Sequence, residues 1–108
     1  MDFDLTEEQQ MVQQMVRDFA QKEIVPHIQE WDEKVHFERR VLQKMGELGL
    51  LGAPIPENYG GSGMDYVSLA LICEELERAD TAFRVVMSVH VGLNSLTLLQ
   101  WASEEQKQ

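Results

Sequence analysis

The sequence has 108 residues, the length of one ordinary domain, and 44% of them are hydrophobic, which is enough for a single core. Nine Lys and Arg against 19 Asp and Glu give a formal net charge of −10, which disfavours binding to nucleic acid and to anionic membranes. The single cysteine, Cys73, excludes an intramolecular disulfide and a cysteine-based metal cluster, and the acidic N-terminus is unlike a signal peptide, so we expect a cytosolic protein.

The first predicted element is a helix that begins with a capping box. Thr6 and Gln9 have the spacing at which each side chain bonds the free backbone N–H of the other residue. Apolar residues then recur at helical spacing from Val12 to Phe19, and the stripe slips by about one position further along the chain. Pro26 explains the slip, because proline lacks an N–H donor and crowds the preceding turn. We therefore expect the first helix to kink or break at Pro26.

A second, shorter helix is expected before a segment rich in glycine and proline. Its apolar residues share one face at helical spacing; they are Val41, Leu42, Met45 and Leu48. Gly46 and Gly49 mark its end. Residues 50–64 then hold four of the seven glycines and two of the three prolines, a density that favours turns over a regular helix. This segment is predicted to be a connector between two helices.

The glycines of the connector invite comparison with a dinucleotide-binding loop, in which G-x-G-x-x-G lies between a strand and a helix. Gly61 and Gly63 have the first spacing, but Tyr66 stands where the third glycine belongs, and no strand pattern precedes them. We therefore reject a phosphate-binding role and predict a tight turn in which one or more glycines adopt a positive φ.

The third predicted helix begins at Asp65, a good N-cap. Its apolar stripe follows at helical spacing and consists of Leu69, Ile72, Cys73 and Leu76. Glu74, Glu75 and Glu77 fall largely on the opposite side of the helix, together with Arg78. Because runs of carboxylates are mostly exposed, we interpret them as a solvated acidic face and not as catalytic acids or bases.

The fourth predicted helix begins at Asp80 or Thr81 and runs to about Ala102. From Val85 onward it carries no charge, as a membrane span would, but its Ser, Thr, His, Asn and Gln residues make it too polar for lipid. We expect no membrane insertion and a helix buried in a helical bundle. His90 is expected to be a hydrogen-bonded core histidine. The three histidines are too scattered to predict a metal site.

The last residues are interpreted as the first turn of a fifth helix. Ser103 and Gln106 repeat the spacing of a capping box. This helix would have five residues after its cap, whereas isolated helices shorter than roughly 12 residues are marginal. We therefore expect a chain cut from a longer protein. The predicted fold is all-α, a bundle of four helices plus a truncated fifth.

Five segments, taken in order, resemble the N-terminal helical domain of the acyl-CoA dehydrogenases. They are the start Leu5-Thr6-Glu7-Glu8-Gln9, the segments Gly46–Gly52, Pro56–Gly63 and Glu74–Asp80, and the closing Ser103–Gln108. The resemblance covers the chain almost end to end. It implies that residues 1–108 are this domain, without the β-domain and the C-terminal α-domain of the family.

The resemblance also implies the chemistry of a full-length protein. Members of this family oxidise an acyl-CoA thioester to the 2-enoyl-CoA in fatty acid or amino acid catabolism; FAD takes the β-hydride, and an electron-transfer flavoprotein receives the electrons. The family also implies a homo-oligomer. The glutamate that removes the α-proton belongs to the C-terminal domain, so we place no catalytic and no cofactor-binding residue in this chain. We expect the chain alone to be inactive and colourless, and to self-associate.

Arg84 opens the fourth helix, where a cation is mildly unfavourable because a helix N-terminus is itself positive. From the residues alone it is a surface arginine or a partner of Glu77. Segment 82–89 resembles the glutaryl-CoA dehydrogenase branch, whose arginine meets the distal carboxylate of the acyl group. The resemblance implies a substrate-binding set that consists of Arg84, Val85, Ser88, Val89 and Leu93.

Several alternatives remain open. Val85, Val89 and Leu93 lie four residues apart, and their spacing favours core packing, a role that can coexist with substrate contact. The segment 90–93 departs from the glutaryl-CoA dehydrogenase branch, which leaves a plain monocarboxylic acyl substrate open. The protein could also be a stand-alone helical interaction module without catalysis, or an acyl-CoA oxidase, in which oxygen reaches the reduced flavin.

Overall fold

The computed structural model describes residues 3–108, and every regular element within them is helical. The α-helices are α1 (Glu7–Glu23), α2 (Ile28–Glu33), α3 (Arg39–Glu47), α4 (Tyr66–Ala79), α5 (Thr81–Ser88), α6 (Leu96–Trp101) and α7 (Glu104–Lys107). There are also three 3-10 turns, η1 (Val25–His27), η2 (Leu50–Gly52) and η3 (Glu57–Tyr59), and a π-helix, η4 (Val89–Ser95). The predicted all-α fold is confirmed.

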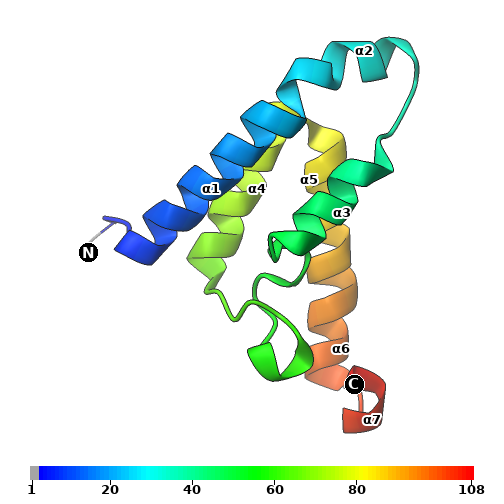
Figure 1. Ribbon diagram of the computed structural model, residues 1–108. Helices are drawn as coiled ribbons and strands as arrows, with labels where there is room; N and C mark the ends of the chain where they lie inside the picture. Colours follow the sequence, from blue (N-terminus) through cyan, green and yellow to red (C-terminus); the bar gives the residue numbers. More distant parts are fainter. Residues whose placement is uncertain (1–2) are drawn as a thin grey trace.

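The helices α1, α3 and α4 and the continuous run α5–η4–α6 form four arms, and α7 is a short fifth helix at the foot of α6 (Figure 1). Helices α1 and α4 lie side by side and run in the same direction. Helix α3 and the continuous run α5–η4–α6 return in the opposite direction (Figure 1). This is the predicted bundle of four helices plus a short fifth.

Local sequence signals define the ends of α1. Thr6 donates its N–H to Gln9 Oε1 at 2.9 Å, and Gln9 donates its N–H to Thr6 Oγ1 at 3.2 Å, which confirms the predicted capping box. At the other end, α1 stops at Glu23, and a 3-10 turn that contains Pro26 leads into α2. The predicted break at Pro26 is confirmed, because proline cannot supply the N–H that a continuing helix needs.

The core lies where α1, α3, α4 and α5 meet. Its largest fully buried side chains are Val16, Ile24, Val41, Met45, Leu50, Ile72, Leu76, Phe83, Met87 and Val91. Burying one large aliphatic or aromatic side chain contributes about 1.5–3 kcal/mol. Since each arm supplies at least one of these residues, the shared core holds the arms together.

The connector between α3 and α4 depends on its glycines. Gly49, just before it, and Gly60 and Gly63 within it have φ of 82°, 87° and 64°, so the predicted positive φ is confirmed. Gly61 is needed for a different reason, because a Cβ atom there would overlap the carbonyl oxygen of Ile55. The connector therefore folds tightly onto itself beside α3.

The fourth arm differs from its prediction in two ways. The sequence predicts one helix to about Ala102, but the arm consists of α5, the π-helix η4 and α6, and it ends at Trp101. By length and composition alone, the run Thr81–Trp101 could cross a membrane: its mean hydropathy is 1.4, and 17% of this window is buried. The expectation that this bundle buries the helix is therefore wrong, because the other arms cover only one of its faces.

Candidate functional site

Arg84 and Glu77 form an ion pair between α5 and α4. Arg84 donates its Nε–H to Glu77 Oε2 at 2.9 Å, and Thr81 donates its hydroxyl to Glu77 Oε1 at 3.0 Å. The Arg84 guanidinium holds the pKa of the Glu77 carboxyl below its ordinary value. Within residues 3–108 this pair uses only the Nε of Arg84, so the two terminal nitrogens can donate to another acceptor.

Ser88 lies four residues after Arg84 on α5, so the two side chains share one helix face. Ser88 is half-buried, and its hydroxyl oxygen lies 3.9 Å from the sulfur of Cys73 on α4. A guanidinium and a hydroxyl on adjacent turns are donors that suit a carboxylate. The structure therefore brings two of the five predicted substrate-binding residues onto one face.

The three apolar residues of the predicted set point out of the bundle. Val85, Val89 and Leu93 have exposed fractions of 39%, 45% and 68%, and we call them the outer stripe. Core packing, the role that their spacing favours, is therefore wrong within this chain. Other positions of the same arm, including Phe83 and Met87, fill the core instead. The outer stripe is an uncovered apolar surface.

The π-helix η4 keeps the buried and the exposed side chains of this arm on constant sides of the helix axis. The buried side follows a four-residue spacing through Phe83, Met87 and Val91, which we call the inner stripe, to the half-buried Ser95 and Leu99. In an α-helix with about 3.6 residues per turn, side chains four residues apart drift around the axis. The i→i+5 bonds of a π-helix widen the turn and offset this drift. The sustained four-residue spacing is a sequence signal that could have predicted η4.

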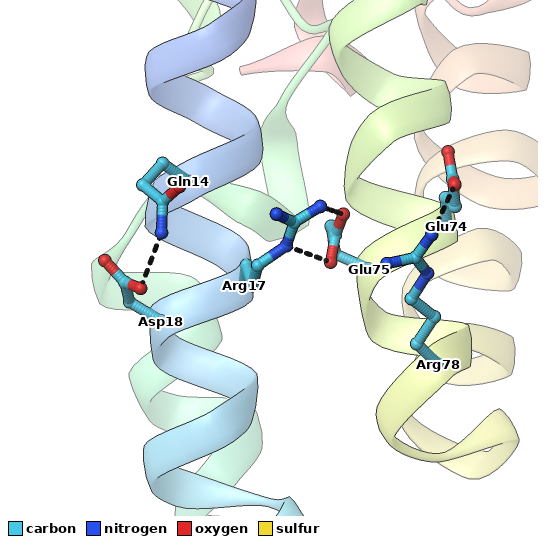
Figure 2. A network of polar contacts seen from close by, with 6 residues as sticks. All are labelled: Gln14, Arg17, Asp18, Glu74, Glu75 and Arg78. Carbon is cyan, nitrogen blue, oxygen red and sulfur yellow. Dashed lines mark hydrogen bonds and ion pairs between the residues drawn. The ribbon is translucent and has the colours of Figure 1, made fainter.

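Glu75 is not part of a solvated acidic face, and that prediction is wrong for it. Glu75 is 3% exposed and accepts two hydrogen bonds from Arg17 of α1, from Nη2 at 2.8 Å and from Nε at 3.2 Å (Figure 2). The bonds from Arg17 hold the pKa of the Glu75 carboxyl below its ordinary value, although burial opposes the shift. Glu74 and Glu77 do lie at the surface, where Glu74 accepts from Arg78 at 3.4 Å.

His90 is exposed on η4, so the prediction of a core histidine is wrong. It lines a cavity of about 370 Å³ between the connector and α6, together with Tyr59 and Leu98. Tyr59 also donates its hydroxyl to Glu104 at 2.7 Å, which fixes α7 against the connector. Within residues 3–108, no group of three or more His, Cys, Asp or Glu side chains is placed to hold a metal ion.

The connector is not built to cradle a phosphate. The backbone N–H groups of residues 60–63 each donate to a carbonyl oxygen of residues 52–57. A phosphate-binding loop needs N–H groups that point at the ligand instead. This geometry agrees with the predicted tight turn, and the diphosphate of a flavin dinucleotide does not fit it.

Comparison with known proteins gives a consistent result. Residues 6–108 match the family model for the acyl-CoA dehydrogenase N-terminal domain. A protein of Bacillus subtilis described as a probable acyl-CoA dehydrogenase is 48% identical over 108 residues, which is 100% of this chain and 28% of that protein.

Solved structures agree with the sequence comparison. A chain solved in work on the electron transferring flavoprotein of Acidaminococcus fermentans is 41% identical with a TM-score of 0.96, and the match covers 100% of this chain and 28% of that one. A glutaryl-CoA dehydrogenase solved in complex with glutaryl-CoA is 42% identical with a TM-score of 0.93, and the match covers 99% and 28%. The present chain thus spans 28% of the length of these relatives.

Proposed function

Because this chain belongs to the acyl-CoA dehydrogenase family, as an N-terminal domain, we propose that the full-length protein oxidises an acyl-CoA thioester to the 2-enoyl-CoA. The family is one of oxidoreductases. The proposal includes FAD as the cofactor, an electron-transfer flavoprotein as the electron acceptor, and a cytosolic homo-oligomer. The likeness to the chain from the work on an electron transferring flavoprotein supports the choice of acceptor.

FAD enters this proposal as a cofactor of the full-length protein only. The N–H groups of residues 60–63 are bonded within the connector, and within residues 3–108 no glycine loop lies between a strand and a helix. We therefore assign no cofactor-binding residue to this chain. We also assign it no catalytic acid or base, since Glu74, Glu75 and Glu77 are all engaged in ion pairs with arginines.

The function of this domain in our proposal is to contact the acyl group. The observation that carries it is an uncovered apolar stripe that begins beside Arg84, whose terminal nitrogens have no partner within residues 3–108. Apolar surface of this kind marks a site of interaction when it is contiguous. Val85, Val89 and Leu93 would contact the hydrocarbon part of the acyl group, and Arg84 would lie at its polar end.

Arg84 makes a dicarboxylic acyl group the best candidate substrate. Glu77 holds the guanidinium at Nε, and the two remaining nitrogens suit the two oxygens of a distal carboxylate. Ser88 would add a third donor from the next turn of α5. The similarity to a glutaryl-CoA dehydrogenase that binds glutaryl-CoA supports this choice.

The test compares two arginines in the full-length enzyme. Arg84 and Arg78 both pair with a glutamate of α4, but Arg78 is bound to its own helix at the surface, so Arg78→Ala is the matched control. Loss of one partner of a buried charge pair costs about 3–5 kcal/mol, which corresponds to about a hundredfold or more in kcat/KM. We expect this loss for Arg84→Ala with glutaryl-CoA and little change with butyryl-CoA.

Two further results sharpen the test. Arg84→Lys should recover only part of the activity, because an ammonium group lacks the planar fork of a guanidinium. Arg78→Ala should leave both substrates unchanged. If Arg84→Ala lowered kcat/KM equally for both substrates, Arg84 would be structural and the substrate would be a plain monocarboxylic acyl-CoA.

A further inference from the structure

A second hollow, at the opposite end of the fourth arm from α7, is lined by aromatic rings and carboxylates. It has a volume of about 440 Å³ and lies between α2, the loop that follows it, and the start of α5. Its walls include the rings of Trp31, Phe37 and Phe83 and the carboxylates of Asp32 and Asp80. Neither the outer stripe nor Arg84 contributes to it.

The rings form one packed cluster with an accessible edge. Phe37 stacks on Phe83 with 4.8 Å between ring centroids, and Trp31 is tilted against Phe83 at 6.0 Å. Phe83 and Trp31 are 1% and 9% exposed, whereas Phe37 is 38% exposed. Phe83 therefore supports the cluster from within the core, and Phe37 is its most exposed ring.

The charge of the hollow is negative. Asp80 uses Oδ1 to accept the N–H of Ala82, and neither Asp80 nor Asp32 forms an ion pair within residues 3–108. The lining contains no Lys or Arg. The one cationic candidate in the lining, His36, lies 3.4 Å from Glu38.

We propose that this hollow binds an arginine side chain of a partner protein. Carboxylates in the wall exclude an anion by repulsion and disfavour a wholly apolar ligand, because they would lose water without gaining a partner. A guanidinium suits both the rings and the carboxylates of the hollow, since it stacks on an aromatic face and donates to carboxylates through a planar fork. The net charge of −10 attracts basic partners to the whole chain.

Arginine fits better than the other cations. A lysine ammonium is more strongly hydrated and cannot stack as a plane. Within residues 3–108 there is no group of three acidic, histidine or cysteine side chains for a metal ion. The open, shallow hollow also suits a side chain that reaches in from another surface, with its aliphatic stem against Ile28 and Val35.

The test uses the 108-residue chain with Trp101→Phe, so that Trp31 is the only tryptophan. Nα-acetyl-arginine amide is titrated while Trp31 fluorescence and the NMR signals of the Phe37 ring are followed. We expect saturable binding with a dissociation constant on the order of 10 mM, as suits one exposed cation–π and ion-pair contact. The neutral isostere Nα-acetyl-citrulline amide should bind at least threefold more weakly, and the lysine analogue should lie between them.

Two variants locate the binding. Asp32→Asn and Phe37→Leu should each weaken arginine binding at least threefold, whereas Asp18→Asn, which removes an exposed acid on α1, should not change it. Equal effects of Asp32→Asn and Asp18→Asn, or equal binding of arginine and citrulline, would overturn the proposal.

The full-length protein provides the last arm of the test. If the hollow is open to a partner protein there, Phe37→Leu should again weaken binding of the arginine amide relative to Asp18→Asn. Loss of arginine binding by the full-length protein would show that another part of the same protein fills the hollow, and would overturn the assignment to a partner.

Discussion

The interface between α1 and α4 and the arm Thr81–Trp101 show two different ways in which this chain uses a helix surface. Two polar contacts join α1 and α4 in the first interface: Gln9 donates to Asp65 near the start of both helices, and Arg17 donates to Glu75 further along (Figure 2). The arm Thr81–Trp101 is packed against the rest of the chain on one side only. Its inner stripe is almost fully buried, and its outer stripe is exposed.

The α1–α4 interface and the outer stripe differ in whether their side chains have partners within the chain. At the α1–α4 interface the buried carboxylate of Glu75 is paired with Arg17 of the same chain, so its hydrogen bonds and charge need no partner from outside. On the arm Thr81–Trp101, the apolar outer stripe has no partner among the described residues. We infer that the inner stripe and the α1–α4 interface hold the fold, and that the outer stripe serves contacts with the acyl group in the full-length protein.

The largest expected effect comes from the inner stripe. Phe83→Ala should lower the free energy of unfolding by about 3–5 kcal/mol, because it leaves a cavity at the centre of the core. Val89→Ala, on the same arm but in the outer stripe, should change it by less than about 0.5 kcal/mol. Urea unfolding followed by circular dichroism measures both. Similar losses for the two variants would abolish the distinction between the stripes.

The Arg17–Glu75 pair should show an asymmetry. Arg17→Met leaves the carboxylate of Glu75 buried without its partner, which should cost about 2–3 kcal/mol, less than the loss of about 3–5 kcal/mol for a fully buried pair because the Arg17 side chain is 40% exposed. Glu75→Gln should cost less, since Arg17 can turn to water. Thermal unfolding at neutral pH ranks the variants. A larger loss in Glu75→Gln than in Arg17→Met would contradict this account.

The same pair predicts a pH dependence. The pKa of Glu75 is lowered in the folded chain from an ordinary value of 4.5, so its contribution to stability is present above that value and is lost as the pH falls through the folded-state pKa. The stability of the parent chain should therefore decline below about pH 4.5. In Glu75→Gln the part of this loss of stability that Glu75 contributes should be absent. If the stability of Glu75→Gln fell with pH as steeply as that of the parent chain, other carboxyl groups would be responsible for the loss.

The smallest expected effect is self-association of the isolated chain through the outer stripe. Leu93 is 68% exposed on a part of the arm that carries no charge from Val85 onward, and burying it between two chains would favour association. Leu93→Asp should reduce the weight-average mass at high concentration without lowering the unfolding temperature. Sedimentation over a concentration series measures this. A chain that stays monomeric at all concentrations argues against this role of the outer stripe.

Much of the fold could be predicted from local patterns. The capping boxes, the break at Pro26 and the glycine turn of the connector each depend on residues that are neighbours in the sequence, and the structure confirms them. Glu75 could not be predicted in this way, because its partner lies 58 residues away and the pattern of α4 alone places it with exposed glutamates.

The candidate site was predictable only in part. The pairing of Arg84 with Glu77 is one of the two roles that the residues alone predict, and the structure shows that pair. The sequence predicts core packing for the outer stripe and for His90, whereas both are exposed, because a helix without charges predicts burial but does not show which molecule covers it. An apolar surface left open by the absence of the other domains is the expectation behind the predicted self-association. The π-helix was missed although the four-residue spacing of the inner stripe carries its signal.

The acyl-chain preference of the full-length enzyme with Leu93→Ala tests directly whether the outer stripe contacts the acyl group. If the outer stripe contacts the acyl group, removing this side chain should shift the ratio of kcat/KM values toward substrates longer by one or two carbons, by about threefold to tenfold, since one buried CH₂ contributes about 0.8 kcal/mol. The unfolding temperature of the isolated domain should not change. An unchanged chain-length profile together with a lower unfolding temperature would show that the outer stripe packs the protein and does not meet the substrate.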